Sequence, residues 1–170
     1  KIQKYQEAIA DLSAAIKLNP SVAEYYYYRA YAKMEMNDLN GANTDYALAL
    51  HINPTHEPSM KNKAITSLQL LKYDDAIIDF TNLIKLNAND ETYYLNRGIA
   101  NLKKEFYKNA EDDFQKALQI KKQFPEAHFN LANAYSKMEN LPKACDHMKQ
   151  AAKLGYEPAN AHINALCDNK

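Results

Sequence analysis

The chain has 170 residues, with 21 basic and 21 acidic side chains and a formal net charge of zero. This balance disfavours partners that depend on strong electrostatic attraction, such as nucleic acid or an anionic membrane. Three glycines and six prolines are too few for a β-rich or disordered chain, and no apolar run approaches the roughly 20 residues of a membrane-spanning helix. The sequence therefore predicts a helical protein with no nucleic-acid partner and no membrane insertion.

Apolar residues recur at every 34th position along the whole chain. One column of small residues consists of Ala8, Ala42, Ala76, Ala110 and Ala144. Further columns at the same interval begin at Tyr5, Leu12, Ala15 and Leu18. Self-similarity at this period indicates stacked repeats, because one unit of this size is too small to bury its own apolar face.

The apolar spacing within each period is helical. The first helix is expected to end before Pro20, and Ser21 offers an N-cap hydroxyl to a second helix over 25–35. Short polar side chains at Asn37 and Asp38 favour a turn and an N-cap for a third helix over 39–51. The same pair of helices is expected over 56–70 and 73–86, 90–104 and 107–121, and 125–138 and 141–153.

The two ends of the chain differ. The chain begins in what would be the first helix of a repeat, so we expect a partial repeat and a truncated or processed N-terminus. At the other end Gly155 is expected to end a helix, and Pro158 fits the first turn of one more. That helix has one apolar and one polar face, as a capping helix needs, and we expect a native C-terminus after it.

The pattern resembles the tetratricopeptide repeat. Tyr94, Gly98 and Ala100 match the family's first helix, and Ala110 and Phe114 match its second. The slot of Gly98 holds a small residue in every repeat, which lets the two helices of a hairpin approach closely. The signature Trp is absent, and its slots hold Tyr26, Met60, Tyr94 and His128.

The resemblance implies an all-α, right-handed α-solenoid of stacked antiparallel helix hairpins. We expect a single array over residues 1–170. Its parts would be a partial repeat at 1–20, full repeats at 21–54, 55–88, 89–122 and 123–156, and a capping helix at 157–170.

Residues that carry catalytic or metal chemistry are not grouped in this sequence. None of the five histidines lies at metal-ligand spacing from a cysteine or carboxylate, and no phosphate-binding glycine loop or nucleophile elbow is present. His51 and His56 flank an expected turn, which favours a surface role. We therefore expect no enzyme activity, no metal and no cofactor.

Cys145 and Cys167 lie symmetrically about the last expected turn, so an antiparallel helix pair would bring their Cα atoms within about 7 Å. A disulfide and two buried free thiols both remain open. The segment from Ala144 to Cys167 resembles the closing element of bacterial tetratricopeptide and Sel1-like proteins. Many of those are exported, where a disulfide would persist, so the bacterial cytoplasm and the periplasm are both open.

The resemblance also implies a ligand site, because the family's first helices line a concave face. The expected peptide-binding groove consists of Tyr27, Tyr31, Asn62, Ile65, Leu95, Asn96, Ile99, Phe129, Asn130 and Asn133. The same mapping places Leu102, Lys103 and Lys137 in groove slots. The asparagines that recur with the repeat period can pair with the backbone of an extended peptide. The alternative is that the apolar strip is hairpin packing and the asparagines are repeat consensus.

These expectations favour a non-catalytic scaffold that binds a protein or peptide segment in the groove. The alternatives are a substrate-recruiting or regulatory module of a larger enzyme or envelope assembly, and self-association through the incomplete N-terminal repeat. The carboxylate clamp of the chaperone-binding members is absent, because Ile65 and Phe129 occupy slots that it would need. A chaperone's acidic C-terminus is therefore not the expected ligand.

Overall fold

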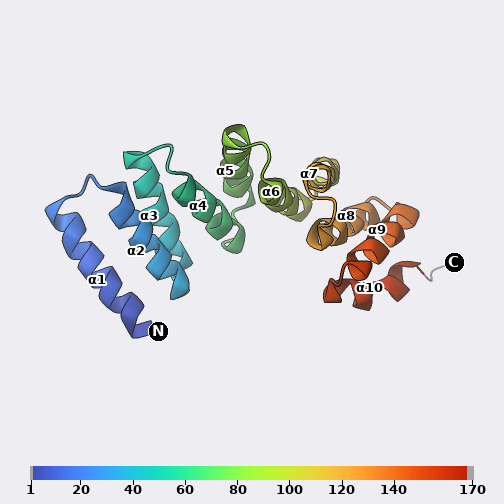
Figure 1. Ribbon diagram of the computed structural model, residues 1–170, viewed down its shortest axis with the longest axis horizontal. Coiled ribbons are helices and arrows are strands. Elements are labelled where there is room, and N and C mark those ends of the chain that lie inside the picture. The colour runs from blue at the N-terminus through green and yellow to red at the C-terminus, as the bar shows by residue number, and fades with distance from the viewer. Residues whose placement is uncertain (1, 168–170) are drawn as a thin grey trace. The chain divides into compact units, whose positions relative to one another are not determined.

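The computed structural model describes residues 2–167, which form ten α-helices and no strand (Figure 1). The helices are α1 (Ile2–Leu18), α2 (Ala23–Glu35), α3 (Leu39–Ile52), α4 (Glu57–Gln69), α5 (Tyr73–Leu86), α6 (Glu91–Lys103), α7 (Tyr107–Ile120), α8 (Pro125–Lys137), α9 (Leu141–Lys153) and α10 (Glu157–Cys167). The all-α fold expected from the repeat period is confirmed. The period fixes where each helix begins, since every turn recurs at the same place within it.

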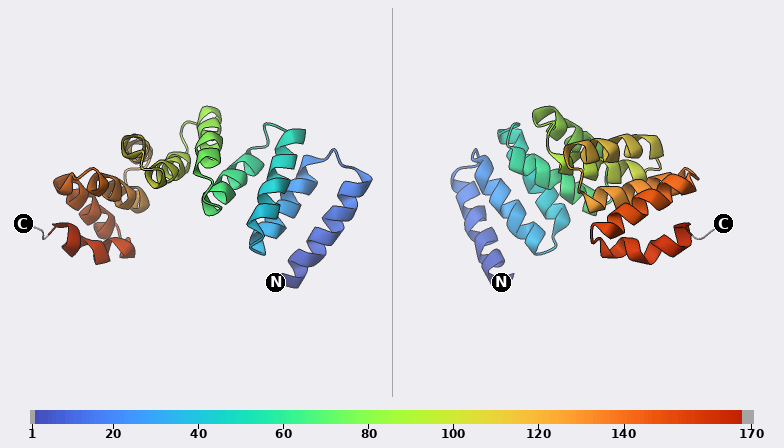
Figure 2. Two further views of the ribbon diagram at one scale, coloured as in Figure 1. Left: turned by 180° about the vertical axis from the view of Figure 1, so that it is seen from behind. Right: turned by 45° about the vertical axis from the view of Figure 1, so that its right-hand side comes forward.

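The helices form two compact units, Lys1–Asp79 and Phe80–Lys170, which divide within α5. In the first unit α1 packs on α2, α2 on α3, and α3 on α4. In the second, α6 packs on α7, α7 on α8, α8 on α9, and α9 on α10. Figure 2 shows these chain neighbours side by side within each unit. Within each unit these helices bury their apolar faces on their chain neighbours, as expected of stacked repeats.

The turn inside each hairpin uses a left-handed residue. Asn37, Leu71, Glu105 and Glu139 have φ between 59° and 64°, and they occupy the same position in successive repeats. The residue after each donates its backbone N–H to a carbonyl five positions back, for example Asp38 to Lys33 at 2.9 Å. This arrangement ends the first helix of every repeat. Only the asparagine among the four is a residue type that favours such a backbone.

The helix caps differ in part from the expectation. Asp38 caps α3 by accepting from the backbone N–H of Gly41 at 2.9 Å, as predicted. The prediction that Ser21 caps α2 is wrong, because the cap position is Val22, whose side chain accepts no bond. The backbone N–H of Ser21 instead donates to Asn19 Oδ1, which forms a turn after α1.

Close helix approach within a hairpin is clearest at Gly98. A Cβ atom added there would lie 2.6 Å from a ring carbon of Phe114, which is closer than side chains pack. Phe114 is fully buried, and the core around it contains Ala110, Leu131, Ala134, Tyr135 and Ala144. The small residue predicted for this slot is therefore required by a neighbouring aromatic ring.

The last helix closes the second unit. Gly155 has a φ of 85°, and α10 begins two residues later with Pro158 in its first turn. Ala159 is fully buried against α8 and α9. Cys145 and Cys167 form a disulfide with their Cα atoms 5.2 Å apart, within the predicted limit. Of the helices described, none combines the length and the apolar character needed to cross a membrane.

Candidate functional site

The side chains expected to bind a ligand project from α2 and α4 in the first unit and from α6 and α8 in the second. We call these residues the first-helix surface. It consists of Tyr27, Tyr31, Asn62, Ile65, Leu95, Asn96, Ile99, Phe129, Asn130 and Asn133. Tyr31 is exposed and the others are half-buried.

In the first unit, packing uses part of this surface. The ring of Tyr27 contacts the rings of Tyr46 and His56, with centroids 6.0 and 5.2 Å apart. The side chain of Asn62 bonds the hydroxyl of Tyr46, although burial, the larger effect, raises the pKa of that phenol. Tyr31 keeps 40% of its area exposed. In the first unit, Tyr31 and Ile65 are therefore the residues of the first-helix surface whose apolar area is open to a ligand.

In the second unit, Leu95 and Ile99 pack against the core around Phe114 while remaining half-exposed. The amide groups of Asn96 and Asn130 each donate to a backbone carbonyl four residues back, at 2.8 Å. Their Oδ1 atoms accept no bond from the residues described. Each of these amides thus uses one N–H within its own helix, while its oxygen and its second N–H can pair with a peptide backbone.

Two members of the first-helix surface in the second unit remain, Phe129 and Asn133. The ring of Phe129 contacts Tyr156 and His162, with centroids 5.1 and 5.7 Å apart, so residues at the start of the capping segment cover it. Asn133 borders a hollow of about 300 Å³. The other lining residues are Leu102, Lys103, Glu105, Tyr107 and Lys137. Three of these, Leu102, Lys103 and Lys137, were mapped to groove slots from the sequence.

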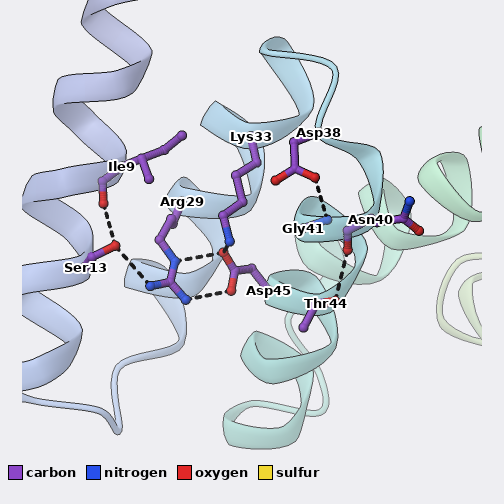
Figure 3. Close-up of polar contacts among 9 residues, drawn as sticks. All are labelled: Ile9, Ser13, Arg29, Lys33, Asp38, Asn40, Gly41, Thr44 and Asp45. Atoms are coloured by element: carbon purple, nitrogen blue, oxygen red, sulfur yellow. Dashed lines mark hydrogen bonds and ion pairs between the residues drawn. The ribbon is translucent and has the colours of Figure 1, made fainter.

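A buried ion pair, which was not predicted from the sequence, joins the two helices of each of three hairpins. In the first unit, Arg29 Nη2 and Lys33 Nζ both lie 2.7 Å from the carboxylate of Asp45 (Figure 3). The same guanidinium donates to the hydroxyl of Ser13 on α1, at 3.2 Å. One arginine therefore links three helices.

The same arrangement recurs along the chain. Lys63 pairs with Asp79 at 2.6 Å, and Arg97 pairs with Asp113 at 2.6 Å. Arg97 also donates to Thr81 of α5. Cations at 29, 63 and 97 and carboxylates at 45, 79 and 113 recur with the repeat period. This recurrence is visible in the sequence, but it does not show that the two columns meet or that they are buried.

Burial controls the electrostatics of these pairs. It raises the pKa of Asp79 and Asp113 above the ordinary range, and the cations Lys63 and Arg97 oppose that rise. Arg29 shows the complementary effect, because its bond to Asp45 raises the pKa of the guanidinium. Each carboxylate is buried and faces a cation across its hairpin, so we regard the pairs as structural.

The last hairpin contains a histidine pair instead. His128 Nδ1 and His147 Nδ1 lie 2.9 Å apart, and the ring of His147 stacks on Tyr135 with centroids 5.6 Å apart. Burial is the main cause that lowers the pKa of both imidazoles. Within residues 2–167 no three His, Cys, Asp or Glu side chains gather in a way that could hold a metal ion.

Comparisons with known sequences match parts of the chain to repeat families. A family model described as TPR repeat matches residues 106–139. Two models described as Tetratricopeptide repeat match residues 125–157 and 1–57. A search of curated proteins gave no match.

Solved structures of the same fold are similar over nearly the whole chain. The crystal structure of YrrB, described as a TPR protein with an unusual peptide-binding site, has a TM-score of 0.88 and 18% identity, and the match covers 97% of this chain and 86% of that one. MamA residues 41-end from Desulfovibrio magneticus RS-1 has a TM-score of 0.84 and 19% identity, covering 90% and 86%. Another crystal structure of MamA has a TM-score of 0.84 and 18% identity, covering 92% and 91%. These likenesses establish the fold. The Sel1-like closing element stays a prediction from the sequence.

Proposed function

We propose that the chain is a non-catalytic scaffold that binds a partly apolar segment of a partner protein on its first-helix surface, because tetratricopeptide-repeat models match residues 1–57 and 106–157. The observation that carries the proposal is that α6 has side chains open to a ligand. There Ile99 and Leu95 keep apolar area open to solvent, beside an Asn96 oxygen that accepts no bond from the described residues. YrrB, which has the same fold, is described as having a peptide-binding site, and this supports the choice.

The two kinds of side chain have separate tasks. An amide oxygen at a fixed interval accepts a backbone N–H from a peptide of any sequence, so Asn96 and Asn130 set the path of the segment. Burial of apolar side chains supplies the affinity, at about 25 cal/mol per Å² before the cost of ordering the peptide. Because the chain's net charge is zero, we expect binding to depend weakly on salt.

A binding titration tests the proposal once a pull-down and peptide mapping have supplied the partner segment. Asn96→Ala removes the acceptor, and Ile99→Asp places a charge in the apolar strip. Lys116→Ala on α7 is the matched control, because Lys116 is exposed and lies on a second helix. We expect both first-helix changes to weaken binding at least about tenfold and the control to leave it unchanged. Weakening by the control alone would place the ligand on the second helices.

The alternatives from the sequence use different surfaces. Recruitment of a substrate for a larger enzyme would use the same first-helix surface, so variants of that surface would affect both functions alike. The sequence of the full-length gene product distinguishes this function from that of a scaffold. Self-association would use α1, none of whose residues is fully buried. Molecular mass measured against concentration tests that alternative.

A further inference from the structure

A phenol in the first turn of a second helix binds a carboxylate in the first unit. Tyr5 of α1 donates its hydroxyl to Glu35, the last residue of α2, at 2.9 Å. The bond to Glu35 raises the pKa of this phenol, and Tyr31, one turn earlier on α2, adds to the rise. A carboxylate and an aromatic side chain of one first helix therefore lie next to the phenol of the preceding second helix.

The second unit keeps the phenol but replaces its partner. The residues three repeats after Tyr5, Tyr31 and Glu35 are Tyr107, Asn133 and Lys137. On α8 the phenol's neighbours are thus a short amide and an ammonium in place of a long aromatic side chain and a carboxylate. An ammonium has no lone pair to accept a hydrogen bond, so Lys137 cannot replace Glu35 as the acceptor for Tyr107.

A hollow of about 300 Å³ lies beside Tyr107, and we call it the Tyr107 hollow. Its lining consists of Leu102, Lys103, Glu105, Tyr107, Asn133 and Lys137. Within residues 2–167 the phenol, the Asn133 amide and the two ammonium groups make no hydrogen bond or ion pair. These four groups can all donate, and they come from α6, α7 and α8.

The lining favours an anion. Lys103 and Lys137 carry two positive charges, and the single carboxylate, Glu105, forms an ion pair with neither of them within the described residues. Tyr107 and Asn133 are half-buried and add neutral donors, so the preference does not depend on exposed lysines alone. A carboxylate from outside would give Tyr107 the acceptor that Tyr5 has in the first unit.

We propose that the Tyr107 hollow binds the side-chain carboxylate of an acidic residue in the partner segment. The inference rests on the proposed function, because Asn133 belongs to the first-helix surface, and it adds one chemical requirement for the partner. The carboxylate accepts from the phenol of Tyr107 and from the ammonium groups of Lys103 and Lys137. Charge-assisted bonds are roughly twice as strong as neutral ones, so a neutral amide in the same place binds more weakly.

Three blocked tripeptides of similar shape test the charge preference without the partner. Acetyl-Ala-Glu-Ala-amide, acetyl-Ala-Gln-Ala-amide and acetyl-Ala-Lys-Ala-amide carry one negative charge, no charge and one positive charge. NMR shifts of the Asn133 side-chain amide and the Tyr107 ring follow their binding at low ionic strength, where exposed charges are least screened. We expect the glutamate peptide to bind about five-fold more tightly than the glutamine peptide, and the lysine peptide to give no saturable shift.

Two variants and a control locate the site. Lys137→Glu gives α8 the carboxylate that α2 has in Glu35; the side chain is exposed, so the variant should fold, lose the glutamate peptide and prefer the lysine peptide. Tyr107→Phe removes the hydroxyl alone and should weaken binding of the glutamate peptide about threefold, measured at the Asn133 amide. Lys116→Gln on α7, exposed and outside the lining, should leave binding unchanged.

The proposal is overturned if the three peptides bind equally, or if the glutamate peptide gives no saturable shift. It is also overturned if Lys137→Glu, shown to be folded by circular dichroism, still prefers the glutamate peptide. Tighter binding of acetyl-Ala-Gln-Ala with a free C-terminal carboxylate than of the glutamate peptide would contradict the assignment to a side chain. Failure of the proposed function would appear separately, because Asn96 and Ile99, which test it, do not line this hollow.

Discussion

At the scale of single residues, the carboxylate of Asp113 shows how a buried charge is tolerated in this fold. Its side chain is 6% exposed and accepts from Arg97 and from Asn101, the latter at 2.9 Å. Breaking a buried pair costs more than the pair contributes, because the remaining charge has lost its compensation. The contribution of Arg97 and Asp113 to stability must therefore be measured with both side chains replaced as well as with one.

Arg97→Met should lower the free energy of unfolding by about 3 kcal/mol, since Asp113 would remain buried and charged without its cation. Arg97→Met combined with Asp113→Leu should recover most of that loss. Urea denaturation of the three proteins measures both effects. Equal stability of the single variant and the wild type would contradict the burial of Asp113.

Gly98→Leu should destabilise the protein by about 1–3 kcal/mol, although leucine is the better helix former. The reason is the ring of Phe114, which lies 2.6 Å from the place of the first added atom. Ala47→Leu on the exposed side of α3 is the control and should be nearly neutral. A thermal melt of the Gly98 variant that matches the control would show that the hairpin can open to admit the side chain.

The sequence was sufficient to predict the small residue at Gly98 but not the ion pairs. A column of small residues has one interpretation, which is close packing. A column of charged residues is usually a solvated surface, so Arg29, Lys63 and Arg97 gave no reason to expect burial. Their partners lie on the following helix of the hairpin, and only a hairpin of known register brings such positions together.

At the scale of elements, α10 is held by packing and by one covalent link. Its buried Ala159 and the disulfide to α9 lie towards opposite ends of the helix. The helix has 11 residues, which is shorter than an isolated helix needs to be stable in water. Its order therefore depends on these attachments.

Removing the disulfide by Cys145→Ser and Cys167→Ser should cost α10 about 3 kcal/mol of local stability. Hydrogen exchange of the α10 amides should become faster, and exchange of the α2 and α3 amides should stay the same. Reduced wild-type protein should behave like the variant. Unchanged protection of α10 would mean that packing alone holds it.

The histidine pair should make the α8–α9 hairpin sensitive to acid. Burial lowers the pKa of His128 and His147 in the folded state, whereas unfolded histidine titrates near about 6.5. As the pH falls below that value, the unfolded chain binds protons first, so folding stability falls; at higher pH these two histidines add no pH dependence.

Melting temperatures measured between pH 5 and pH 8 test this dependence. The decrease at low pH should be smaller in His147→Asn, which removes one titrating group and the repulsion between two imidazolium ions. His51→Gln is the control, because His51 is exposed and should give the wild-type curve. A variant His147→Asn that loses stability as steeply as the wild type would contradict the account.

Helix positions were predictable because each helix boundary recurs with the repeat period. One turn that is clear in the sequence therefore locates the equivalent turns of the other repeats. The details of the turns were less predictable. Leu71 and Glu139 are poor residues for a left-handed backbone, yet the hairpin register places them there. Ser21 is a favoured N-cap residue, but the turn after α1 places Val22 at that position. Local preference was overridden in both cases by packing between helices.

At the scale of the whole molecule, the sequence assigns the candidate site to the first helices but does not show which of its side chains are open to a ligand. Membership of a first helix follows from the period, which is a property of the sequence. Exposure depends on neighbours: Tyr27 packs on His56, and Phe129 lies under Tyr156 and His162. One N–H of the Asn96 amide and one of the Asn130 amide are used within their own helices, which periodicity alone does not reveal.

The central claim is that a partner segment binds the first helices, and isoleucine methyl NMR tests it most directly. Ile65 and Ile99 report on α4 and α6, while Ile78 on α5 and Ile120 on α7 report on second helices. Titration with the mapped partner segment should shift the methyl signals of Ile65 and Ile99 and leave those of Ile78 and Ile120 in place. Shifts at Ile78 and Ile120 with none at Ile65 and Ile99 would contradict the account.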